Sequence, residues 1–392
     1  MSGFFESSTV QKERPSGLIP RCGSCGLFKT CRSPKMPVYG KGRKQILFVG
    51  EAPGKTEDEQ GRPFVGQAGQ FLRETLEALD FDLDKDAWTS NSLICRPPGN
   101  KTPEDNQIEY CRPNLLNIIE QLKPAVVVLL GRSAVRSALP VYWKGEVGEL
   151  SRWVGWQIPG PDHWICPTYH PSYLGRMNSP LLNRMFSQHL EKAVSIESAP
   201  PEPHDFRPQI KLLYDADDVL TALEEIDSEG GWVAVDYETN CLKPEYPNAR
   251  IFSCALSNGH RTVSFPWCNV VAEGMVELFR SGRTKKIASN LKFEERWTRK
   301  MLGTRVNNWG WDTMLAAHCL DNRRGICSLK FQSWVKLGVP TYNDHIAPYL
   351  GSGKGHYNSI EKIELDDLLY YGGMDALLEY RLAMQQMKEM GL

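Results

Sequence analysis

The sequence contains no long hydrophobic run. Its longest purely apolar stretch, residues 125–130, is far shorter than the roughly 20 residues that a membrane-spanning helix needs. The first 14 residues also lack the apolar centre of a secretory signal peptide. These absences predict a protein of the cytoplasm, which is a reducing compartment, with no membrane as a partner.

An excess of charge is missing as well. The chain of 392 residues holds 46 Lys and Arg against 47 Asp and Glu, so its net charge is −1. The total charge therefore gives no sign of a nucleic-acid partner. Residues 1–50 are locally basic, with nine Lys and Arg against two Asp and Glu. Such a stretch is either a surface that contacts phosphate groups or a solvated tail, and its charge fits both.

Cysteine is not scarce, but its pattern excludes a disulfide framework. The eleven cysteines are odd in number, and most of them stand alone. Cys22 and Cys25 form a Cys-x-x-Cys pair. In a reducing compartment, such a pair indicates metal binding or redox chemistry.

Prolines divide the chain near its middle. Residues 197–208 read ESAPPEPHDFRP, and four prolines in twelve residues prevent both a helix and a central strand. The length of the chain also favours two domains. We expect a first domain over residues 1–198, a Pro-rich linker over 199–205 and a second domain over 206–392.

Both halves have the pattern of an α/β protein. In the first half, predicted strands alternate with predicted helices, which is typical of a mostly parallel sheet with its functional residues at the carboxyl ends of strands. The strands are expected at 45–50, 88–95, 125–131 and 164–168, and the helices at 69–79, 102–122 and 182–194. In the second half, strands at 232–236, 252–256 and 261–265 precede helical segments that end with 366–390. This order predicts an α+β or RNase H-like α/β fold.

Three polar side chains follow or end predicted strands in the first half. Glu51 lies in the turn GEAPG (50–54), Asn91 lies on the next strand, and His170 precedes Pro171, which keeps it out of a helix. Each signal is weak by itself. A glycine-rich turn fits a generic phosphate loop, and a single histidine is usually a surface or core residue.

Three longer strings contain these residues: GEAPGKTEDEQGRPFVGQAG (50–69), SNSLICRPPGNKTP (90–103) and YHPSYL (169–174). In order and spacing they resemble the family 4 (iron–sulfur) uracil-DNA glycosylases. The resemblance implies a three-layer αβα fold for the first domain. It also implies a DNA-repair enzyme that hydrolyses the N-glycosidic bond of deoxyuridine in single- or double-stranded DNA. Uracil is released and an abasic site remains.

The same resemblance assigns residues to the uracil. Phe64 would stack on the flipped base, and Asn91 would hydrogen-bond to its Watson–Crick edge. Glu57 would exclude the methyl group of thymine, and Ala52 belongs to the same uracil-binding set.

Catalysis would depend on Glu51 and His170. Glu51 would position water or stabilise the positive charge on the sugar, and His170 would donate to the uracil oxygen that gains negative charge. Cleavage of the bond develops both charges, so it needs a carboxylate and a donor. Residues 174–177 (LGRM) would contact DNA, with Leu174 in the vacated stack and Arg176 on a phosphate.

One related branch of this family cross-links to its abasic product through a histidine in an inserted loop. Here no insertion interrupts residues 91–103, and the first histidine of the chain is His163. We therefore expect turnover.

By the same resemblance, four cysteines would bind a [4Fe–4S] cluster: Cys22, Cys25, Cys95 and Cys111. Four thiolates also suit tetrahedral zinc, and their spacing alone does not separate the two. Cys31 would not be a ligand. The cluster would have a structural role, because it would hold the basic N-terminal segment on the core.

The second half contains three acidic motifs. Asp236 and Glu238 share one face of a strand, and Tyr371 and Asp375 share one face of a helix. Between them lies NLKFEE (290–295), and WDTMLAAHCLDNRRGICSLK (311–330) follows. The set resembles the proofreading 3′–5′ exonuclease domains of family A DNA polymerases, in the DEDD superfamily with tyrosine.

This second resemblance implies an RNase H-like fold and a site for Mg²⁺ or Mn²⁺. The metal ligands would be Asp236, Glu238, Glu294 and Asp375, and Tyr371 would orient the attacking water. One residue departs from the family, because its second motif usually ends in Asp. The longer side chain of Glu294 moves the carboxylate by about 1 Å, and catalytic rates are sensitive to displacements of this size.

No polymerase motif follows the third acidic motif. We expect a DNA polymerase partner, either on a separate chain or further along a longer chain, in a phage-like arrangement. Two alternatives remain open. One is a uracil-sensing accessory module of a replicative polymerase, with an inactive or weak exonuclease half. The other is a zinc-stapled scaffold protein.

Overall fold

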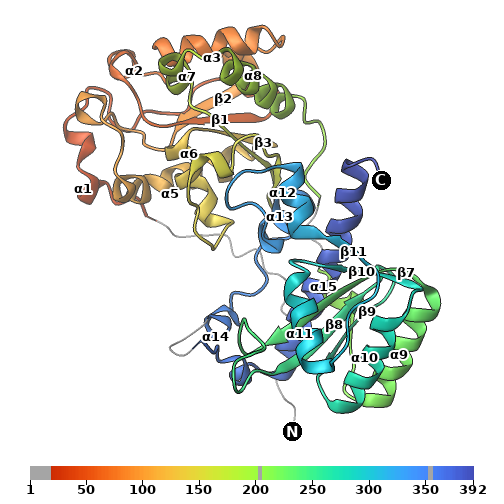
Figure 1. The fold of residues 1–392 in the computed structure, drawn as a ribbon. Coiled ribbons are helices and arrows are strands. Elements are labelled where there is room, and N and C mark those ends of the chain that lie inside the picture. Colours follow the sequence, from red (N-terminus) through yellow and green to blue (C-terminus); the bar gives the residue numbers. More distant parts are fainter. Residues whose placement is uncertain (1–18, 202–204, 352–355) are drawn as a thin grey trace. The chain divides into compact units, whose positions relative to one another are not determined.

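The computed structural model describes residues 19–201, 205–351 and 356–392 (Figure 1). The chain forms two compact units, residues 1–203 and 204–392. The first 18 residues of the basic stretch and residues 202–204 of the expected linker lie outside the described part. No described helix is long and apolar enough to cross a membrane.

The first domain is built on a five-stranded sheet in the order β2-β1-β3-β5-β4. All neighbouring strands are parallel except β4, which pairs with β5 in the antiparallel sense. Strands β1 and β3 are buried along their whole length, as expected for parallel strands that are covered on both faces. The strands are β1 (Ile46–Gly50), β2 (Ala87–Asn91), β3 (Val126–Leu130), β4 (Ile158–Pro159) and β5 (Trp164–Thr168).

Helices cover both faces of this sheet and make three layers (Figure 1). On one face lie α3 (Gln67–Glu77), α7 (Pro171–Met177) and α8 (Pro180–Val194), and on the other lie α5 (Asp105–Leu122) and α6 (Arg132–Ala138). Leu72 and Leu76 of α3 and Phe186 of α8 share a core with the sheet residues Phe48 and Val128. Shorter helices are α1 (Cys22–Cys25), η1 (Leu27–Lys29), α2 (Lys55–Gln60), α4 (Leu83–Asp86), η2 (Pro98–Asn100), η3 (Leu139–Val141) and η4 (Leu150–Arg152).

The second domain contains a six-stranded mixed sheet in the order β11-β10-β7-β8-β9-β6. Strand β8 is antiparallel to both of its neighbours, and the other pairs are parallel. The strands are β6 (Ile210–Leu212), β7 (Gly231–Thr239), β8 (Ile251–Ser257), β9 (Thr262–Pro266), β10 (Thr284–Ala288) and β11 (Trp309–Asp312).

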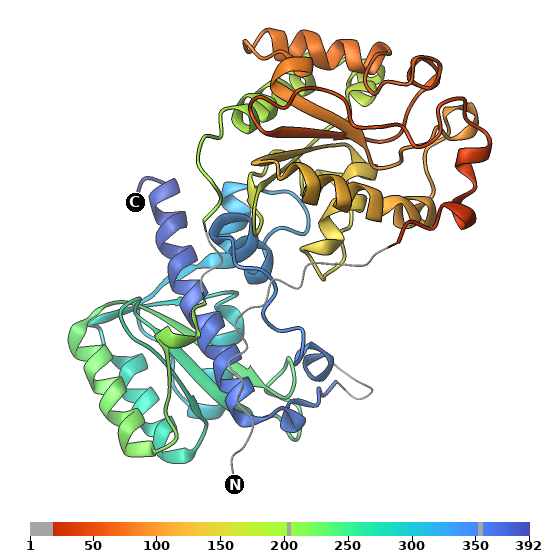
Figure 2. The ribbon, with the colours of Figure 1, turned by 180° about the vertical axis from the view of Figure 1, so that it is seen from behind.

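The long helix α15 (Leu365–Glu389) crosses one face of this sheet, and α9 (Ala216–Glu229) and α10 (Asn269–Arg280) cover the other (Figure 2). Val233, Val235 and Tyr237 of β7 pack in the core under α9 and α10. Because side chains alternate along a strand, Ala234, Asp236 and Glu238 face α15. The remaining helices are η5 (Arg207–Gln209), α11 (Lys292–Leu302), α12 (Thr313–Leu320), α13 (Leu329–Leu337), α14 (Ala347–Leu350) and η6 (Ile360–Lys362).

The predicted α/β fold is confirmed for both domains, but several elements differ from the expectation. Strand β2 ends at Asn91, four residues before the predicted end at Cys95. Strands β4, β6, β10 and β11 were not predicted, and helices separate the late strands of the second domain. Strand β10 reads TKKIA, and its Lys286 is buried because the ammonium donates to the carbonyls of Ser281 and Thr284. Because two of its five residues are lysines, this strand lacks the hydrophobic pattern that predicts a buried strand.

Candidate active sites

The carboxyl edge of the first sheet brings the predicted polar residues together. Glu51 follows β1, Asn91 ends β2, and His170 comes two residues after the end of β5. All three line one cavity of about 580 Å³. Phe64, Glu57 and Ala52 line the same cavity, so one space holds every residue that was expected to contact uracil.

Gly50 makes room for the most crowded part of this cavity. A Cβ atom on Gly50 would lie 2.4 Å from Oδ1 of Asn91 and 2.7 Å from Cζ of Phe64. Phe64 is almost buried and has a φ of +56°, which is a strained conformation for an aromatic residue. The ring and the amide thus meet over the bare end of β1, where a flat aromatic ligand has both a stacking surface and a hydrogen-bonding partner.

Glu57 holds together the loop that carries Phe64. Its Oε1 accepts from the Gly66 N–H at 2.8 Å, and its Oε2 accepts from the Gly54 N–H at 3.1 Å. The carboxylate therefore joins the two glycine turns of this loop. Sequence reasoning gave Glu57 only a contact with the base and missed this structural role.

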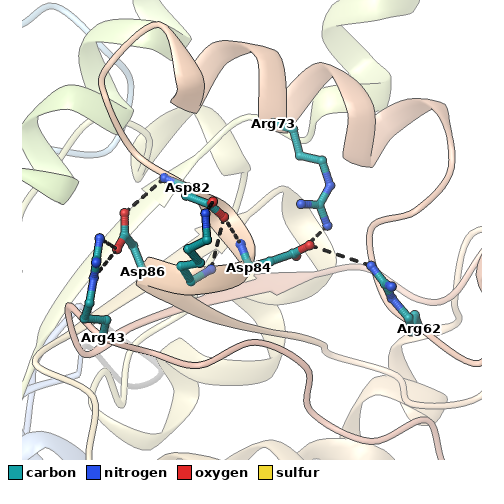
Figure 3. A network of polar contacts seen from close by, with 7 residues as sticks. Arg43, Arg62, Arg73, Asp82, Asp84 and Asp86 are labelled. Atoms are coloured by element: carbon teal, nitrogen blue, oxygen red, sulfur yellow. Dashed lines mark hydrogen bonds and ion pairs between the residues drawn. The ribbon is translucent and has the colours of Figure 1, made fainter.

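A second network of polar contacts supports the same loop from outside (Figure 3). Arg62, two residues before Phe64, lies over the Tyr39 ring at 4.1 Å and pairs with Asp84 at 3.7 Å. Asp84 also accepts from Arg73 at 2.7 Å. Asp84 lies on α4, which leads directly into β2, so the network links the Phe64 loop to the strand that ends in Asn91.

Glu51 is oriented by a residue that sequence reasoning missed. The Ser133 hydroxyl donates to its Oε2 at 2.9 Å. Ser133 lies in the first turn of α6, directly after β3, and is buried. The sequence did contain a signal for Ser133, because this residue follows the apolar strand AVVVLLG (125–131) by two positions. It therefore lies at the carboxyl end of another strand, at the same edge of the sheet.

His170 is the N-cap of α7, and its ring has a defined tautomer. Nδ1 accepts from the Ser172 N–H at 3.2 Å, and it lies 2.7 Å from the Ser172 hydroxyl. A neutral ring that accepts at Nδ1 carries its proton on Nε2. Burial, and then the charge of Arg176, lowers the pKa of His170 to about 4. The side chain is therefore a neutral Nε2–H donor at neutral pH.

The position of Leu174 does not favour the role expected for it. This side chain is 1% exposed and belongs to the hydrophobic core of the first domain. The segment LGRM is also part of helix α7, which turns Leu174 toward the sheet. On the same helix, Tyr173 and Met177 are exposed, and Arg176 lines the cavity.

The four predicted cysteine ligands surround a separate cavity. Cys22 and Cys25 lie on α1, Cys95 lies in the loop after β2, and Cys111 lies on α5. All four line one small cavity of about 20 Å³. Two of the sulfurs accept hydrogen bonds: Cys95 Sγ from the Lys35 N–H at 3.2 Å and Cys111 Sγ from the Asn114 amide at 3.4 Å.

Two neighbours of the cysteine cavity are informative. Cys31 does not line it, although its thiol is close enough to Cys95 to raise the pKa of that residue, after the larger effect of burial. Ala52 packs against the apolar cluster that contains Cys95 and Cys111, and it also lines the Glu51 cavity. The cysteine region and the candidate active site therefore share a wall.

In the second domain, the structure brings Asp236, Glu238 and Asp375 together. One ligand oxygen from each lies within 4.8 Å of the others, as a divalent metal requires. Gly372 of α15 lies beside two of them, since a Cβ there would be in ordinary van der Waals contact with Glu238 Cγ at 3.5 Å and with Asp236 Oδ2 at 3.8 Å. Burial, and then the charge of Asp375, raises the pKa of Asp236 to about 7.

A lysine that sequence reasoning missed lies in this carboxylate group. The Lys330 ammonium donates to Asp375 at 2.6 and 3.0 Å and to the Tyr371 hydroxyl at 3.1 Å. It also donates to the hydroxyl of Tyr342, which in turn donates to Asp375. Lys330 is the last residue of the string 311–330, which carries the family resemblance. The sequence therefore contained this residue in a matched motif but did not indicate its role.

Glu294 lies in the first turn of α11, is 3% exposed and lies near Asp236, whose charge adds to burial in raising the pKa of Glu294. It is outside the group of Asp236, Glu238 and Asp375. Asp312, at the end of β11, fixes the turn before Glu294. Its carboxylate accepts from the Asn290 and Leu291 N–H groups at 3.0 and 3.1 Å. Asp312 is another residue that sequence reasoning missed.

Comparisons with known proteins agree with this geometry. Residues 37–194 match the family described as the uracil DNA glycosylase superfamily. A type-4 uracil-DNA glycosylase of Saccharolobus solfataricus is 31% identical over 186 residues, which covers 47% of this chain and 85% of that protein. Through its first domain, the chain belongs to the type-4 uracil-DNA glycosylase family. Residues 212–390 of this family member match the family described as 3′-5′ exonuclease.

Two further similarities concern the rest of this glycosylase-family chain. A DNA polymerase of Bacillus phage SP01 is 24% identical over 390 residues, which covers 90% of this chain and 41% of the polymerase. Escherichia coli RNase D is similar in structure, with a TM-score of 0.36 and 11% identity over 46% of this chain and 45% of that chain. The predicted type-4 glycosylase family is confirmed by the first set of matches, and the second half of the chain is similar to the predicted 3′–5′ exonucleases over residues 212–390.

The neutral state of His170 predicts a specific pH dependence. Because burial lowers its pKa to about 4, the ring stays neutral as the pH falls from 8 to 5.5 and gains a proton only near pH 4. We expect His170→Ala to lower single-turnover uracil excision by at least ~100-fold. The ratio of wild-type to variant rates should stay constant from pH 8 to 5.5. A ratio that rises as the pH falls through about 6.5, the usual histidine pKa, would mean that the charged ring is the donor.

Proposed function

We propose that the first domain hydrolyses the N-glycosidic bond of deoxyuridine in DNA, releasing uracil and leaving an abasic site. One observation carries this proposal: Glu51, Phe64, Asn91 and His170 line a single cavity at the carboxyl edge of the sheet. These residues provide a stacking face, an amide, a carboxylate and a neutral donor, which are the groups that base excision needs.

Recognition begins with a base that has left the stack. The Phe64 ring and the Asn91 amide meet over Gly50, so a uracil stacked on the ring has its polar edge beside the amide. Asn91 both donates and accepts, which matches the N3–H and O4 of uracil. Four cations also line the cavity and would contact the phosphates on either side of the flipped nucleotide: Lys55, Lys101, Arg132 and Arg176.

Bond cleavage separates charge between the sugar and the base. The Glu51 carboxylate, held by the Ser133 hydroxyl, stabilises the cationic sugar and orients the water that attacks it. The Nε2–H of His170 donates to the uracil oxygen that becomes negative. Because both groups are already fixed by neighbours, little reorganisation is needed during the reaction.

Glu51→Gln tests the charge of this carboxylate without removing its shape. We expect the variant to lose at least ~100-fold in single-turnover uracil release, since an amide cannot stabilise a cationic sugar. The matched control is Glu77→Gln, an exposed position at the end of α3. Equal rates for wild type and Glu51→Gln would rule out the assigned role.

We infer that Cys22, Cys25, Cys95 and Cys111 hold a [4Fe–4S] cluster. A tetrahedral zinc site with Zn–S bonds of ~2.3 Å places its sulfurs within ~3.8 Å of one another. In the described part of the chain, no three of these thiols lie within 4.8 Å of one another, while all four line one cavity. That arrangement fits a polynuclear cluster better than a single ion. The cluster would join α1, the loop after β2 and α5, and would support Ala52 beside Glu51.

Cysteine variants distinguish the four proposed cluster ligands from Cys31, which is not expected to be a ligand. Cys95→Ser and Cys111→Ser should lose the broad visible absorbance of the cluster and much of the soluble yield, because ligation contributes to folding. Cys31→Ser, the matched control, should keep both. Iron content and absorbance of the purified variants provide the readout. A colourless Cys31→Ser with a normal Cys22→Ser would overturn the ligand set.

For the second domain, we propose metal-dependent 3′–5′ hydrolysis of single-stranded DNA. Asp236, Glu238 and Asp375 would hold a divalent cation, Mg²⁺ or Mn²⁺, which would lower the pKa of the attacking water. Tyr371 faces the same carboxylates and would orient that water. Lys330 would act as a positioning residue, because its ammonium donates to both Tyr371 and Asp375 and fixes their relative positions. Similarity to the phage polymerase leads us to propose a DNA polymerase as partner.

Uracil-free single-stranded DNA tests this activity without strand breaks at abasic sites. We expect wild type with Mn²⁺ to shorten a 5′-labelled strand from its 3′ end. The double variant Asp236→Ala, Glu238→Ala should be at least ~1,000-fold slower, because both metal ligands of β7 are lost. Equal digestion by the two proteins would identify a contaminating nuclease. Faster digestion by Glu294→Asp would show that the natural Glu supports metal-dependent catalysis less well than an Asp at this position.

A further inference from the structure

Three carboxylate oxygens near the exonuclease site are buried and accept no hydrogen bond: Asp236 Oδ2, Glu294 Oε2 and Glu379 Oε2. Asp236 and Glu294 belong to the acidic motifs, whereas Glu379 lies outside all three. Leaving one such oxygen without a partner costs roughly 1–3 kcal/mol, more when it is charged. Three of them together indicate a missing cationic partner.

Glu379 is placed to share that partner. It lies on α15 one helical turn after Asp375, so both side chains are on the same face of the helix. It is 1% exposed, and the charges of Asp236, Glu294 and Asp375 all act on it. The backbone N–H of Ser289 also interacts with its carboxyl group. Glu379 therefore lies between strand β7 and the turn that leads to Glu294.

Among the described side chains, no Lys or Arg forms an ion pair with Glu294 or Glu379. Lys330 is engaged by Asp375, Tyr342 and Tyr371, and its charge also acts on Asp236. Asp236, Glu238 and Asp375 already form one group of converging oxygens. Glu294 and Glu379 lie outside that group.

We propose that Glu379 is a protein ligand of a second divalent cation, which it would share with Glu294 and with the unpaired oxygen of Asp236. The proposal rests on the proposed exonuclease function and adds a residue to its site. A longer arm at Glu294 moves the second cation away from the place that an Asp would give it. Glu379, reaching in from α15, supplies the oxygen that the moved ion then needs, since Mg²⁺ and Mn²⁺ prefer carboxylate and water ligands.

A purely structural role would have a different signature. A protonated Glu379 that only donates a hydrogen bond inside the core can be replaced by Gln, which keeps the shape and the donor. A metal ligand cannot be replaced in this way, because the amide lacks the negative charge. Glu379→Gln therefore separates the two roles, and Glu361→Gln, an exposed position, is the matched control.

The experiment counts Mn²⁺ bound to the full chain with its cluster, by titration with electron paramagnetic resonance of free Mn²⁺. We expect two sites in wild type and in Glu361→Gln. Glu379→Gln should keep one site and weaken the second by at least ~10-fold. Glu294→Gln should weaken the same second site, which keeps the test decisive if Glu379→Gln folds poorly. Thermal melting in EDTA checks folding, and Glu379→Gln should melt no lower than wild type.

Two sites of unchanged affinity in Glu379→Gln would overturn the proposal. Digestion of uracil-free DNA is measured in parallel, so that the two claims fail separately. If wild type binds two Mn²⁺ and Glu379→Gln binds one, while neither degrades DNA, the metal site stands and the exonuclease function falls. If Glu379→Gln binds two Mn²⁺ with the affinities of wild type and both proteins degrade DNA equally, the exonuclease stands and the role of Glu379 falls.

Discussion

Ionisable groups are buried away from water in both domains. The chemistry of each site depends on what offsets the free-energy cost of burying these groups. A buried charge is costly, so a group either becomes neutral or acquires a partner. His170 becomes neutral, and its two contacts with Ser172 fix the ring nitrogen that keeps the proton. The carboxylates of the second domain are too many to be balanced by Lys330 alone, which supports the proposed site for divalent cations.

A glycine makes the close packing of the first site possible. Gly50 allows Phe64 and Asn91 to meet over the end of β1, because a methyl group at this position would overlap both neighbours. The first site therefore needs an absent side chain as much as it needs the reactive ones.

Much of this arrangement is predictable from the sequence, because the signals are local. Buried strands such as β1 and β3 are continuous apolar runs, and the residues after them lie at the carboxyl edge of a parallel sheet by geometry alone. That reasoning places Glu51 and His170 in one cavity. It also places Asp236 and Glu238 on one face of a strand.

The residues that sequence reasoning missed act through contacts between distant segments. Ser133 matters because it donates to Glu51, and Lys330 because it reaches Asp375. Glu379 has no motif, and only the packing of α15 on β7 shows where its carboxylate lies. Leu174 was assigned to DNA because LGRM was taken for a loop, whereas the segment is helical and turns this side chain into the core.

We propose that excision needs only the neutral and acidic groups of the first domain, whereas strand shortening needs divalent metal in the second. The decisive measurement uses one 5′-labelled single strand with one uracil, incubated with the full chain in EDTA and then in Mn²⁺. In EDTA, we expect uracil release and, after alkali, a single cut at the uracil position. In Mn²⁺, we expect additional shortening from the 3′ end. Uracil release that fails in EDTA and appears only with divalent metal would mean that excision also depends on a metal ion.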